Sequence, residues 1–381
     1  MTAPDVEVTI VGGGIVGCAL ADAAARAGCG VVLLEKEAAL ARGTTSRNSE
    51  VMHGGMYYPT GSLKARFCVE GRRRLHDFAA GAGVPWLGCG KLIVAVDEAE
   101  RPGLERLLDR GLANGVEDFR LVDGDELRRL EPQVRGCAAL VSPHTAVCDA
   151  EGLARTLAAR AAEHGAQVLT GAQVTGLERE DGGWRVTVGG GERREGWTHT
   201  SGAVINAAGL YADRVAALAG VDVQARGWRQ VLVRGNYFGV ADRHRGRVGR
   251  LVYPVPPADD STLGVHLCLD TGGGLRLGPD YDGPLPAGVD PDTLSWAVDP
   301  GRGDLFFAGA RRFLPWLERD DLSPAMCGVR PKLAAHAFHD FTIDRGEGDF
   351  AGLINLVGID SPGLTASMAI ARHVVDDLLP A

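Results

Sequence analysis

No two cysteines of this sequence are spaced as C-x-x-C, although the chain has eight of them. A scattered set in a chain of this length predicts reduced thiols, rather than a disulfide framework or a structural zinc site. His336 and His339 have the spacing of a ligand pair, but no cysteine or carboxylate cluster accompanies them. We therefore predict no metal site.

Long apolar runs and concentrations of positive charge are also missing. No apolar stretch approaches the roughly 18 residues that span a bilayer, so we expect no transmembrane segment. We see no signal peptide before the first predicted strand and expect a cytoplasmic protein, with peripheral contact to a membrane left open. The net charge is −9, and the basic run at 72–74 suits a solvated helix face. These features argue against a nucleic-acid partner and leave a small-molecule substrate.

A glycine-rich turn near the N-terminus is the strongest motif. A short buried strand over 6–11 runs into G-x-G-x-x-G at 12–17 and then into an alanine-rich helix over 15–27. The first glycine of such a turn permits the bend, the second admits a pyrophosphate, and the third lets helix and strand pack closely. The helix N-terminus offers N–H groups to the phosphates. A second strand over 31–34 ends at Glu35, which is placed to accept hydrogen bonds from ribose hydroxyls.

The segments that follow favour FAD over NAD as the dinucleotide. Residues 42–49 form a small polar stretch without helical periodicity, which suits wrapping a long ligand. A buried strand that begins at 203 ends at a glycine and would return to the first sheet. The excursion between them is too long for one βαβ unit, so a second domain is inserted, as in FAD enzymes of this class. The cofactor-binding residues predicted here are Gly12, Gly14, Ile15, Val16, Gly17, Glu35, Lys36, Thr44, Thr45, Ser46, Asn48, Ser49, Val174, Ala207, Ala208 and Gly209.

These patterns predict an α/β fold, with a Rossmann-like FAD-binding domain and an interleaved α+β substrate domain built on an antiparallel sheet. We assign residues 1–80, 146–221 and 326–381 to the FAD-binding domain. Residues 81–145 and 222–325 form the substrate domain. A helix is expected over 151–164, strands over 91–96 and 230–237, and a long surface loop over 278–291.

Eight strings, spread in order along nearly the whole chain, point to one group of flavoproteins. They are SRNSEVMHGGMYYP at 46–59, GSLKA at 61–65, GKLIVA at 90–95, VRGNYF at 233–238, LVYPVP at 251–256, LGVHL at 263–267, GVRPKL at 328–333 and INLVGIDSPGLT at 354–365. In these strings the chain resembles the L-2-hydroxyglutarate oxidase/dehydrogenase family, part of the wider group of D-amino-acid-oxidase-like flavoproteins.

The resemblance implies oxidation of an L-2-hydroxy acid to the 2-oxo acid, with hydride passing to flavin N5. Two departures leave the identity of the substrate open. After His266 the family tends to continue with a Thr-Arg pair, whereas this chain has Cys268-Leu269. The family's Gly-Pro-Asn-Ala stretch is Gly278-Pro279-Asp280-Tyr281 here. Loss of a cation from the substrate domain would remove a partner for a second carboxylate.

Two histidines are the first candidates for catalysis. Oxidation of a hydroxy acid needs a base for the hydroxyl proton, and the resemblance places His266 at the end of a strand in the substrate domain. A core histidine bonded within the sheet is the alternative. His53 follows the polar FAD segment among glycines that permit close approach to the isoalloxazine ring. Its role is open between ring contact, which we favour, a covalent flavin anchor as in some relatives of the wider group, and a structural histidine.

Cations and a helix N-terminus would handle negative charge on the substrate and on reduced flavin. We expect Arg330 and Lys332 in a turn before the last strand, where Arg330 would bind a carboxylate and Lys332 would lie near flavin N1. The alternative is a pair of surface cations. A glycine-containing turn opens the final helix, whose N-terminus would point at the flavin C2=O. The cofactor-binding residues of this turn are Gly358, Ser361, Pro362, Gly363, Leu364 and Thr365.

Five further side chains complete the predicted substrate pocket, and they are Tyr57, Tyr58, Lys64, Arg234 and Tyr237. Tyr57 stands where glycerol-3-phosphate dehydrogenases, which share the His-Gly-Gly string, carry an arginine, and this argues against a phosphate substrate. The chief rival function is an amine or amino-acid oxidase of the same fold, which needs no hydroxyl base. A glycerol-3-phosphate dehydrogenase-like enzyme and a redox-silent flavoprotein are further alternatives. The sequence does not identify the electron acceptor.

Overall fold

The computed structural model describes residues 3–190, 195–257 and 264–379. Leu263, the first residue of the string at 263–267, lies outside the described residues. Among the helices of the described ranges, none is long and apolar enough to cross a membrane.

The first sheet contains the predicted nucleotide-binding strands. Strand β1 (Val6–Val11) lies between β2 (Val31–Glu35) and β12 (Trp197–Asn206), all parallel, so the chain does return to the first sheet after its long excursion. Two further parallel strands extend the sheet, an antiparallel hairpin pairs with the start of β12, and a last strand pairs antiparallel with β19. These additional strands are β9 (Gln167–Thr170), β10 (Val174–Glu180), β11 (Gly183–Val188), β18 (Thr342–Arg345) and β19 (Leu353–Val357).

Both faces of this sheet are covered at its centre, which explains why strands such as β2 and β19 are buried along their whole length. Alternate side chains such as Ile10 and Leu33 pack against one group of helices, while Val32 and Leu34 pack against helix α6 (Ala212–Leu218) and the β10–β11 hairpin. The helices of the first group are α1 (Ile15–Arg26), α2 (Leu63–Ala82), α5 (Ala150–Glu163) and α8 (Gly363–His373). The bounds of α1 and α5 differ from the predicted ones by no more than one residue at each end.

The second sheet forms the substrate side of the molecule. Its strands run in the order β17-β13-β16-β15-β14-β5-β7-β6, and all neighbours are antiparallel except β5 and β14. Their bounds are β5 (Lys91–Ala95), β6 (Arg120–Asp123), β7 (Ala138–Ser142), β13 (Val231–Val240), β14 (Leu251–Pro254), β15 (Leu267–Leu269), β16 (Leu275–Leu277) and β17 (Leu322–Lys332). Helices α3 (Arg101–Ala113), α4 (Gly124–Leu130) and α7 (Gly303–Arg311) accompany this sheet, and β3 (Val51–Met52), β4 (Trp86–Leu87) and β8 (Ala146–Cys148) form a third, small sheet.

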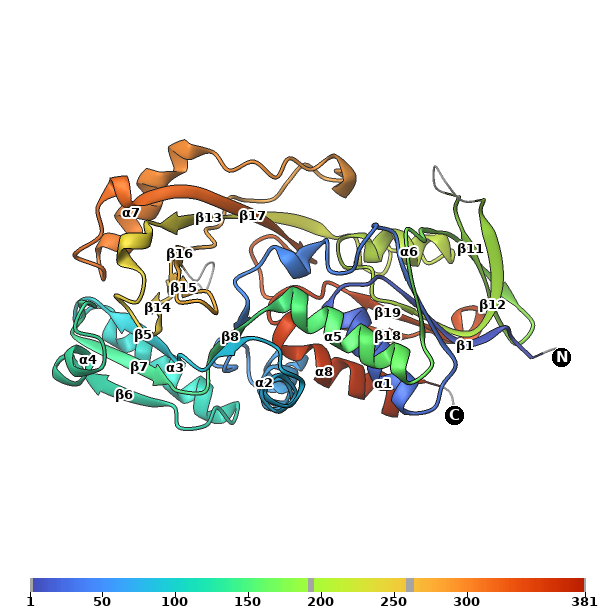
Figure 1. Cartoon of the computed structure of the whole chain (residues 1–381), viewed down its shortest axis with the longest axis horizontal. Coiled ribbons are helices and arrows are strands. Elements are labelled where there is room, and N and C mark those ends of the chain that lie inside the picture. The colour runs from blue at the N-terminus through green and yellow to red at the C-terminus, as the bar shows by residue number, and fades with distance from the viewer. Residues whose placement is uncertain (1–2, 191–194, 258–263, 380–381) are drawn as a thin grey trace.

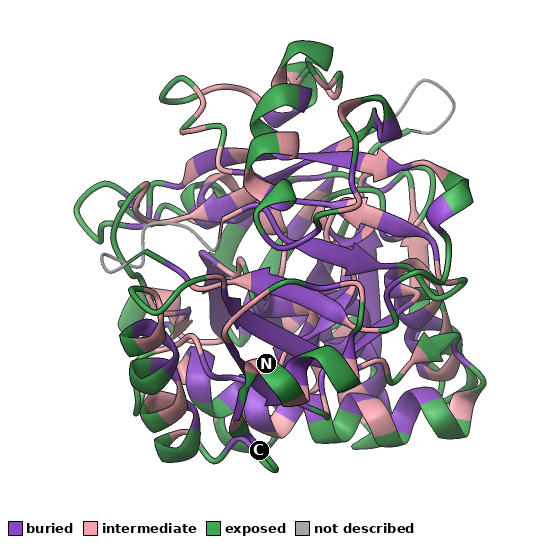
Figure 2. Ribbon diagram, turned by 90° about the vertical axis from the view of Figure 1, so that its left-hand side faces the viewer, coloured by how far each residue is buried: buried purple, intermediate pink, exposed green. Residues whose placement is uncertain are grey.

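Figure 1 shows the two large sheets side by side, with β13 and β17 of the second sheet running along the top toward the first. In Figure 2, buried residues concentrate on the strands, and exposed residues lie along the outer faces of helices and in loops. The α/β fold class predicted from the sequence is confirmed by this arrangement, because a parallel sheet covered by helices is joined to a largely antiparallel one.

Two predictions, one domain boundary and the exposure of one loop, differ from the structure. The domain boundary placed at 326 falls inside β17, which pairs with β13 as far as Lys332, so the second sheet ends later than predicted. The segment 278–291 has no α-helix or strand, apart from one isolated bridge and the start of a 3₁₀ turn at Pro291, but it does not start on the surface. Asp280 is only 4% exposed and accepts two hydrogen bonds from Arg302, because a carboxylate beside the sheet needs a buried partner.

The contact between α2 and α8 gives a test of the packing. A Cβ added to Gly71 of α2 would lie 2.1 Å from the carbonyl oxygen of Thr365 in α8. We therefore expect Gly71→Ala to lower the free energy of unfolding by about 1–3 kcal/mol. Gly81 of the same helix has no atom within 4 Å of an added Cβ. Gly81→Ala is the matched control and should raise the free energy of unfolding by about 0.5–1 kcal/mol. Urea denaturation measures both, and equal stability of the two variants would contradict the packing described.

Candidate active site

A cavity of about 1370 Å³ is lined by residues from both large sheets. From the first sheet come Glu35 at the end of β2 and Val174 at the start of β10. From the second come Tyr237 and Arg330, together with His266 beside β15. The predicted cofactor and catalytic residues therefore meet around a single space, although they are far apart in the sequence.

The glycine turn leaves backbone exposed at one part of this cavity. Gly12 has a φ of 109°, and a Cβ there would lie 2.5 Å from the carbonyl oxygen of Ala207. A Cβ at Gly17 would lie 1.8 Å from the carbonyl oxygen of Gly12. Only glycine thus allows α1 to begin this close to β1, which is the role predicted for Gly17. With Gly14 and Ile15 in the cavity lining, the N-terminus of α1 fits a pyrophosphate.

Glu35 presents a fixed carboxylate to the same part of the cavity. One of its oxygens accepts a hydrogen bond from the Gly13 N–H at 2.7 Å, and the other accepts one from the Glu37 N–H at 2.8 Å. Burial raises the pKa of Glu35, while these two backbone bonds oppose the shift. Each oxygen keeps a second lone pair for a hydroxyl of the ligand.

The polar segment after β2 is held in place by its own side chains. Residues Thr44–Ser46 form one 3₁₀ turn, in which the Thr45 hydroxyl accepts a hydrogen bond from the Ile15 N–H at 3.0 Å. The Asn48 amide donates to the carbonyl oxygens of Thr44 and Thr45, at 3.0 and 2.7 Å. The segment is thereby tied to the start of α1 and lies along the cavity.

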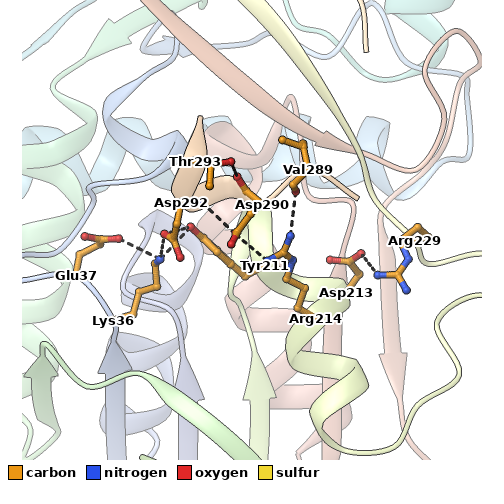
Figure 3. Close-up of polar contacts among 10 residues, drawn as sticks. All are labelled: Lys36, Glu37, Tyr211, Asp213, Arg214, Arg229, Val289, Asp290, Asp292 and Thr293. Atoms are coloured by element: carbon orange, nitrogen blue, oxygen red, sulfur yellow. Dashed lines mark hydrogen bonds and ion pairs between the residues drawn. The ribbon is translucent and has the colours of Figure 1, made fainter. Parts of the chain in front are cut away.

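A cluster of polar and charged side chains holds the segment around residues 290–292 against the part of the cavity where the nucleotide would bind (Figure 3). Tyr211 donates a hydrogen bond to Asp292 at 2.6 Å, and Lys36 bonds to both of them. Arg214 donates to Asp290 at 2.8 Å. Burial acts against the Lys36 charge, but the bonds to Asp292 and Tyr211 raise the pKa of this lysine. We call these five residues the loop clamp, and all five line the cavity.

His266 lies immediately before β15, directly at the N-terminal end of that strand. Its Nδ1 is 2.9 Å from the carbonyl oxygen of Gly264. Because a carbonyl only accepts, Nδ1 carries the proton and Nε2 is a free acceptor in the neutral ring. Its ring stacks on Tyr253 with centroids 3.8 Å apart, and burial lowers the pKa of His266 to about 3.

His53 lies opposite a lysine that the sequence did not single out. The His53 N–H donates to the Thr365 hydroxyl at 2.9 Å, and its Nδ1 is 3.5 Å from the Lys91 ammonium. Burial lowers the pKa of His53, with further contributions from Lys91 and His266. His53 lines the cavity, while Lys91 lies behind it and is fully buried.

Three cations line the cavity close to these histidines. Arg330 and Lys332 both lie within β17, so the prediction that they lie in a turn before the last strand is wrong. Because they are two residues apart, their side chains point to the same face of the strand, which lines the cavity. Arg330 lies close enough to help lower the pKa of His266. Lys332 donates to the carbonyl oxygen of Ala335 at 3.3 Å, and Lys64 pairs with Asp360 at 2.5 Å.

The start of α8 completes this part of the cavity. Pro362, Gly363 and Leu364 line the cavity, and the Ser361 hydroxyl is 3.3 Å from that of Tyr58. Thr365, in the first turn of α8, is fully buried and donates to the carbonyl oxygen of Val51 at 3.2 Å. The helix N-terminus is therefore directed at the cavity, which favours negative charge there.

Most predicted site residues line the cavity. The exceptions are Gly17, Ser46, Arg234, Gly358 and Thr365. Gly17 and Thr365 act through packing, and the Ser46 hydroxyl donates to the Gly43 carbonyl oxygen at 3.1 Å. Gly358 has a φ of 69°, and its N–H donates to the side chain of Gln230 at 3.2 Å.

Arg234 is a wrong prediction, and strand alternation explains it. Its neighbour Gly235 and Tyr237 line the cavity, so the side chain of Arg234 projects from the opposite face of β13. There it donates to the carbonyl oxygen of Ser295.

Lining residues that sequence reasoning missed are Arg110, Tyr253, Tyr281, Asp360 and Trp296. A signal for Lys91 was present, because a lysine that opens an otherwise apolar strand is unusual.

Among the described residues, no group of three or more histidine, cysteine or acidic side chains could hold a metal ion. His336 and His339 line the cavity instead, and His336 Nδ1 is 3.2 Å from the Tyr281 hydroxyl.

Comparison with known proteins adds independent information. The family described as FAD dependent oxidoreductase, abbreviated DAO, matches residues 7–377. The chain is 33% identical to the mitochondrial L-2-hydroxyglutarate dehydrogenase of Arabidopsis thaliana, covering 98% of this chain and 83% of that protein. It is 31% identical to the L-2-hydroxyglutarate dehydrogenase of Indibacter alkaliphilus, covering 98% of each.

Solved structures show the same architecture. An FAD-bound L-α-glycerophosphate oxidase from Mycoplasma pneumoniae has a TM-score of 0.85 and 29% identity, covering 98% of this chain and 94% of that one. A glycine oxidase from Geobacillus kaustophilus has a TM-score of 0.80 at 20% identity, covering 99% and 95%. The second likeness concerns the fold alone.

The loop clamp should slow the release of a bound dinucleotide. We expect Lys36→Met and Asp292→Asn each to speed FAD dissociation a few-fold, with a coupling between them of about 0.5–1 kcal/mol, because both side chains are partly exposed. Recovery of flavin fluorescence after dilution measures the rate, and added salt should diminish the difference. Arg128→Met, which removes an exposed pair with Asp125, is the control. Additive effects of the two clamp substitutions would contradict the clamp.

Proposed function

Because the chain belongs to the DAO family of FAD dependent oxidoreductases, we propose that it oxidises an L-2-hydroxy acid of the 2-hydroxyglutarate type to the 2-oxo acid. The observation that carries the proposal is the alignment, over nearly its whole length, with relatives named L-2-hydroxyglutarate dehydrogenase from a plant, an animal and a bacterium. The arrangement of histidines and cations in the cavity supplies the chemical support. Bound FAD supplies the acceptor for a hydride from the substrate carbon.

His266 is the proposed base. Its Nδ1–H is committed to the Gly264 carbonyl oxygen, so Nε2 is the nitrogen that can receive the substrate hydroxyl proton. A base must be deprotonated before the reaction, and burial keeps the ring of His266 neutral. A structural histidine bonded through both nitrogens would lack this free acceptor.

Arg330, Lys332 and Lys64 are proposed to bind the carboxylates. The Arg330 side chain forms no ion pair or hydrogen bond with any residue in the described ranges, although its backbone belongs to β17, so the planar guanidinium is available for bidentate binding. The Lys64 ammonium forms its ion pair with Asp360, and the same carboxylate is close enough to raise the pKa of Lys332 against the effect of burial. The buried Tyr57 hydroxyl has no partner within the same ranges and is a donor for the substrate. A dicarboxylate would satisfy more of these groups than a monocarboxylate.

FAD is proposed to bind without a covalent bond. Nδ1 of His53 faces the Lys91 ammonium at 3.5 Å, which disfavours a flavin link through this nitrogen, and we propose that Nε2 makes a non-bonded contact with the ring. Acid precipitation of the protein tests the point, because a colourless pellet is expected and a yellow pellet would contradict it.

A substrate panel separates this function from its rivals. The cations of the cavity would also suit a phosphate, and the glycerophosphate oxidase structure is 29% identical, so glycerol phosphate is the second candidate. The panel holds L-2-hydroxy acids, amino acids and glycerol phosphate, each mixed anaerobically with the enzyme. We expect the flavin to be bleached fastest by a five-carbon L-2-hydroxy diacid. Faster bleaching by an amino acid or by glycerol phosphate would overturn the proposal.

We propose a cytoplasmic location for this chain. The relatives from Arabidopsis thaliana and Homo sapiens are named mitochondrial, whereas the one from Indibacter alkaliphilus is not. All eight cysteines are free, which suits a reducing compartment. Cell fractionation tests the location. Oxygen consumption during turnover distinguishes an oxidase from a dehydrogenase. Co-sedimentation of the protein with phospholipid vesicles tests peripheral membrane contact.

Replacing the proposed base gives the first mechanistic prediction. His266→Asn should lower the rate constant of anaerobic flavin reduction by a hydroxy acid about 10²- to 10⁴-fold, because the hydroxyl proton loses its acceptor. His164→Asn, at an exposed histidine that ends α5, is the matched control and should leave the rate unchanged. Stopped-flow absorbance of the flavin measures both. A His266→Asn rate within a few-fold of wild type would remove this residue from the mechanism.

The acid side of the pH profile is a second prediction. Burial lowers the pKa of His266 to about 3, so the deprotonated form is fully present at every pH well above that value. We expect kcat/KM to stay level from pH 7.5 down to pH 5. A histidine with an ordinary pKa of about 6.5 would instead make kcat/KM fall across this range. If kcat/KM of the wild type falls and that of His266→Asn does not, the His266 ring is solvated and the prediction is wrong.

A further inference from the structure

Lys91 is a buried cation for which the described residues supply no carboxylate partner. It opens β5, is 0% exposed, and forms no ion pair with a carboxylate of the described residues. Its ammonium lies 3.9 Å from the centroid of the Tyr253 ring and 3.5 Å from His53 Nδ1. A buried ammonium without a carboxylate partner destabilises a folded protein, so a methyl-ended side chain would serve the core better.

The groups around Lys91 come from several elements, and all are neutral near pH 7. Burial raises the pKa of Cys68 to about 12 and that of Cys89 to about 11, and it raises the pKa of Cys268 as well. Burial also raises the pKa values of the nearby tyrosines and lowers those of the two histidines; these groups are Tyr57, Tyr253, His53 and His266. Burial lowers the pKa of Lys91 itself to about 8. Lys91 is therefore the member of this cluster that changes charge between pH 7 and 9.

We propose that Lys91 is a positioning residue that keeps His53 in the tautomer with its proton on Nε2. The argument is one of donors and acceptors. An ammonium donates and cannot accept, so the ring nitrogen that faces it, Nδ1, must present its lone pair. The proton of the neutral ring then resides on Nε2. This inference rests on the proposed function, because it assigns His53 a part in the same reaction.

The two histidines of the cavity thereby receive opposite roles. In His266, the Gly264 carbonyl oxygen holds the proton on Nδ1 and leaves Nε2 as an acceptor. In His53, the Lys91 ammonium holds Nδ1 as an acceptor and leaves Nε2–H as a donor. Tyr253 links the two arrangements, since its ring contacts both the ammonium and the His266 ring. One histidine can accept the substrate proton while the other donates a hydrogen bond to a carboxylate or to the oxygen that becomes the carbonyl.

Loss of the Lys91 proton should reverse the His53 tautomer. A neutral amine can accept, so Nδ1 could then carry the proton and Nε2 would stop donating. Wild-type kcat/KM is expected to fall above pH 8 for this reason. The thiols and tyrosines that face Lys91 do not account for such a fall, because burial raises the pKa of Cys68 to about 12 and that of Cys89 to about 11, and it raises the pKa values of Cys268 and the tyrosines above their ordinary range as well.

Two variants of Lys91 separate this role from a structural one. Lys91→Met should lower the rate constant of flavin reduction about 10- to 100-fold, the range for loss of an oriented donor. It should also raise the Tm of the holoenzyme at pH 7, because the buried charge is gone. The folded-state pKa of Lys91 is below its unfolded value, so the gain in Tm is complete below pH 8 and disappears as the pH approaches 10.5. Lys91→Gln keeps an N–H donor and should regain part of the rate, without the fall above pH 8.

Arg72→Met is the matched control, since Arg72 is a second buried cation on the neighbouring helix α2. Arg72 donates to Glu117 at 2.6 Å and lines no part of the cavity. Its replacement should lower Tm and leave the pH profile of wild type. If Lys91→Met lowered Tm as Arg72→Met does, Lys91 would be structural and the proposal would be wrong.

The tautomer itself is measured by ¹⁵N NMR of histidine-labelled holoenzyme, with His53→Asn used to assign the signals. We expect a protonated Nε2 and an unprotonated Nδ1 for His53 at pH 7, and the reverse or a mixture in Lys91→Met. The opposite tautomer in wild type would overturn the proposal. This measurement needs no turnover, so it stands apart from the substrate panel: failure of all hydroxy acids to bleach the flavin would refute the proposed function and leave the tautomer result intact.

Discussion

The site depends on a backbone contact that is too close for any side chain. Where β1 ends, Gly12 and Gly17 bring the start of α1 against the chain that leaves β12 at Ala207. This contact fixes the direction of the α1 N–H groups and places Glu35, at the end of the neighbouring strand, beside the same turn. A similar approach at Gly71 brings α2 against the first turn of α8. Two helix N-termini are thus directed at one cavity by positions where no Cβ can exist.

A second constraint is the exclusion of water from the groups that would carry out the reaction. His53 and His266 line the cavity and Lys91 lies beside His53, and burial lowers the pKa of all three. Hydrogen bonds to fixed partners then decide which nitrogen holds a proton. In such surroundings a protonation state is set by the fold, and this is the kind of preorganisation that enzymes use for proton and hydride transfer.

The sequence predicted the local parts of this structure well. The turn from β1 into α1 could be predicted because strand, glycines, helix and terminal acid are adjacent in the chain. The course of β17 and the face chosen by Arg234 could not, because strand pairing and alternation depend on a partner far away in the sequence. Pro331 suggested a turn, yet it lies within β17, opposite Leu232 of β13. Lys91 was overlooked for the same reason, since its neighbours come from α2, β14, β15 and the loop that carries His53.

The account rests on transfer of a hydride from C2 of an L-2-hydroxy acid to FAD in the cavity described. Its most direct test is anaerobic flavin reduction by L-2-hydroxyglutarate with hydrogen or deuterium at C2, followed by stopped-flow absorbance. The account predicts bleaching by both and a smaller rate constant with deuterium, since the C2–H bond breaks as the flavin is reduced. Absence of bleaching by either form, from enzyme whose flavin an amino acid or glycerol phosphate does bleach, would contradict it.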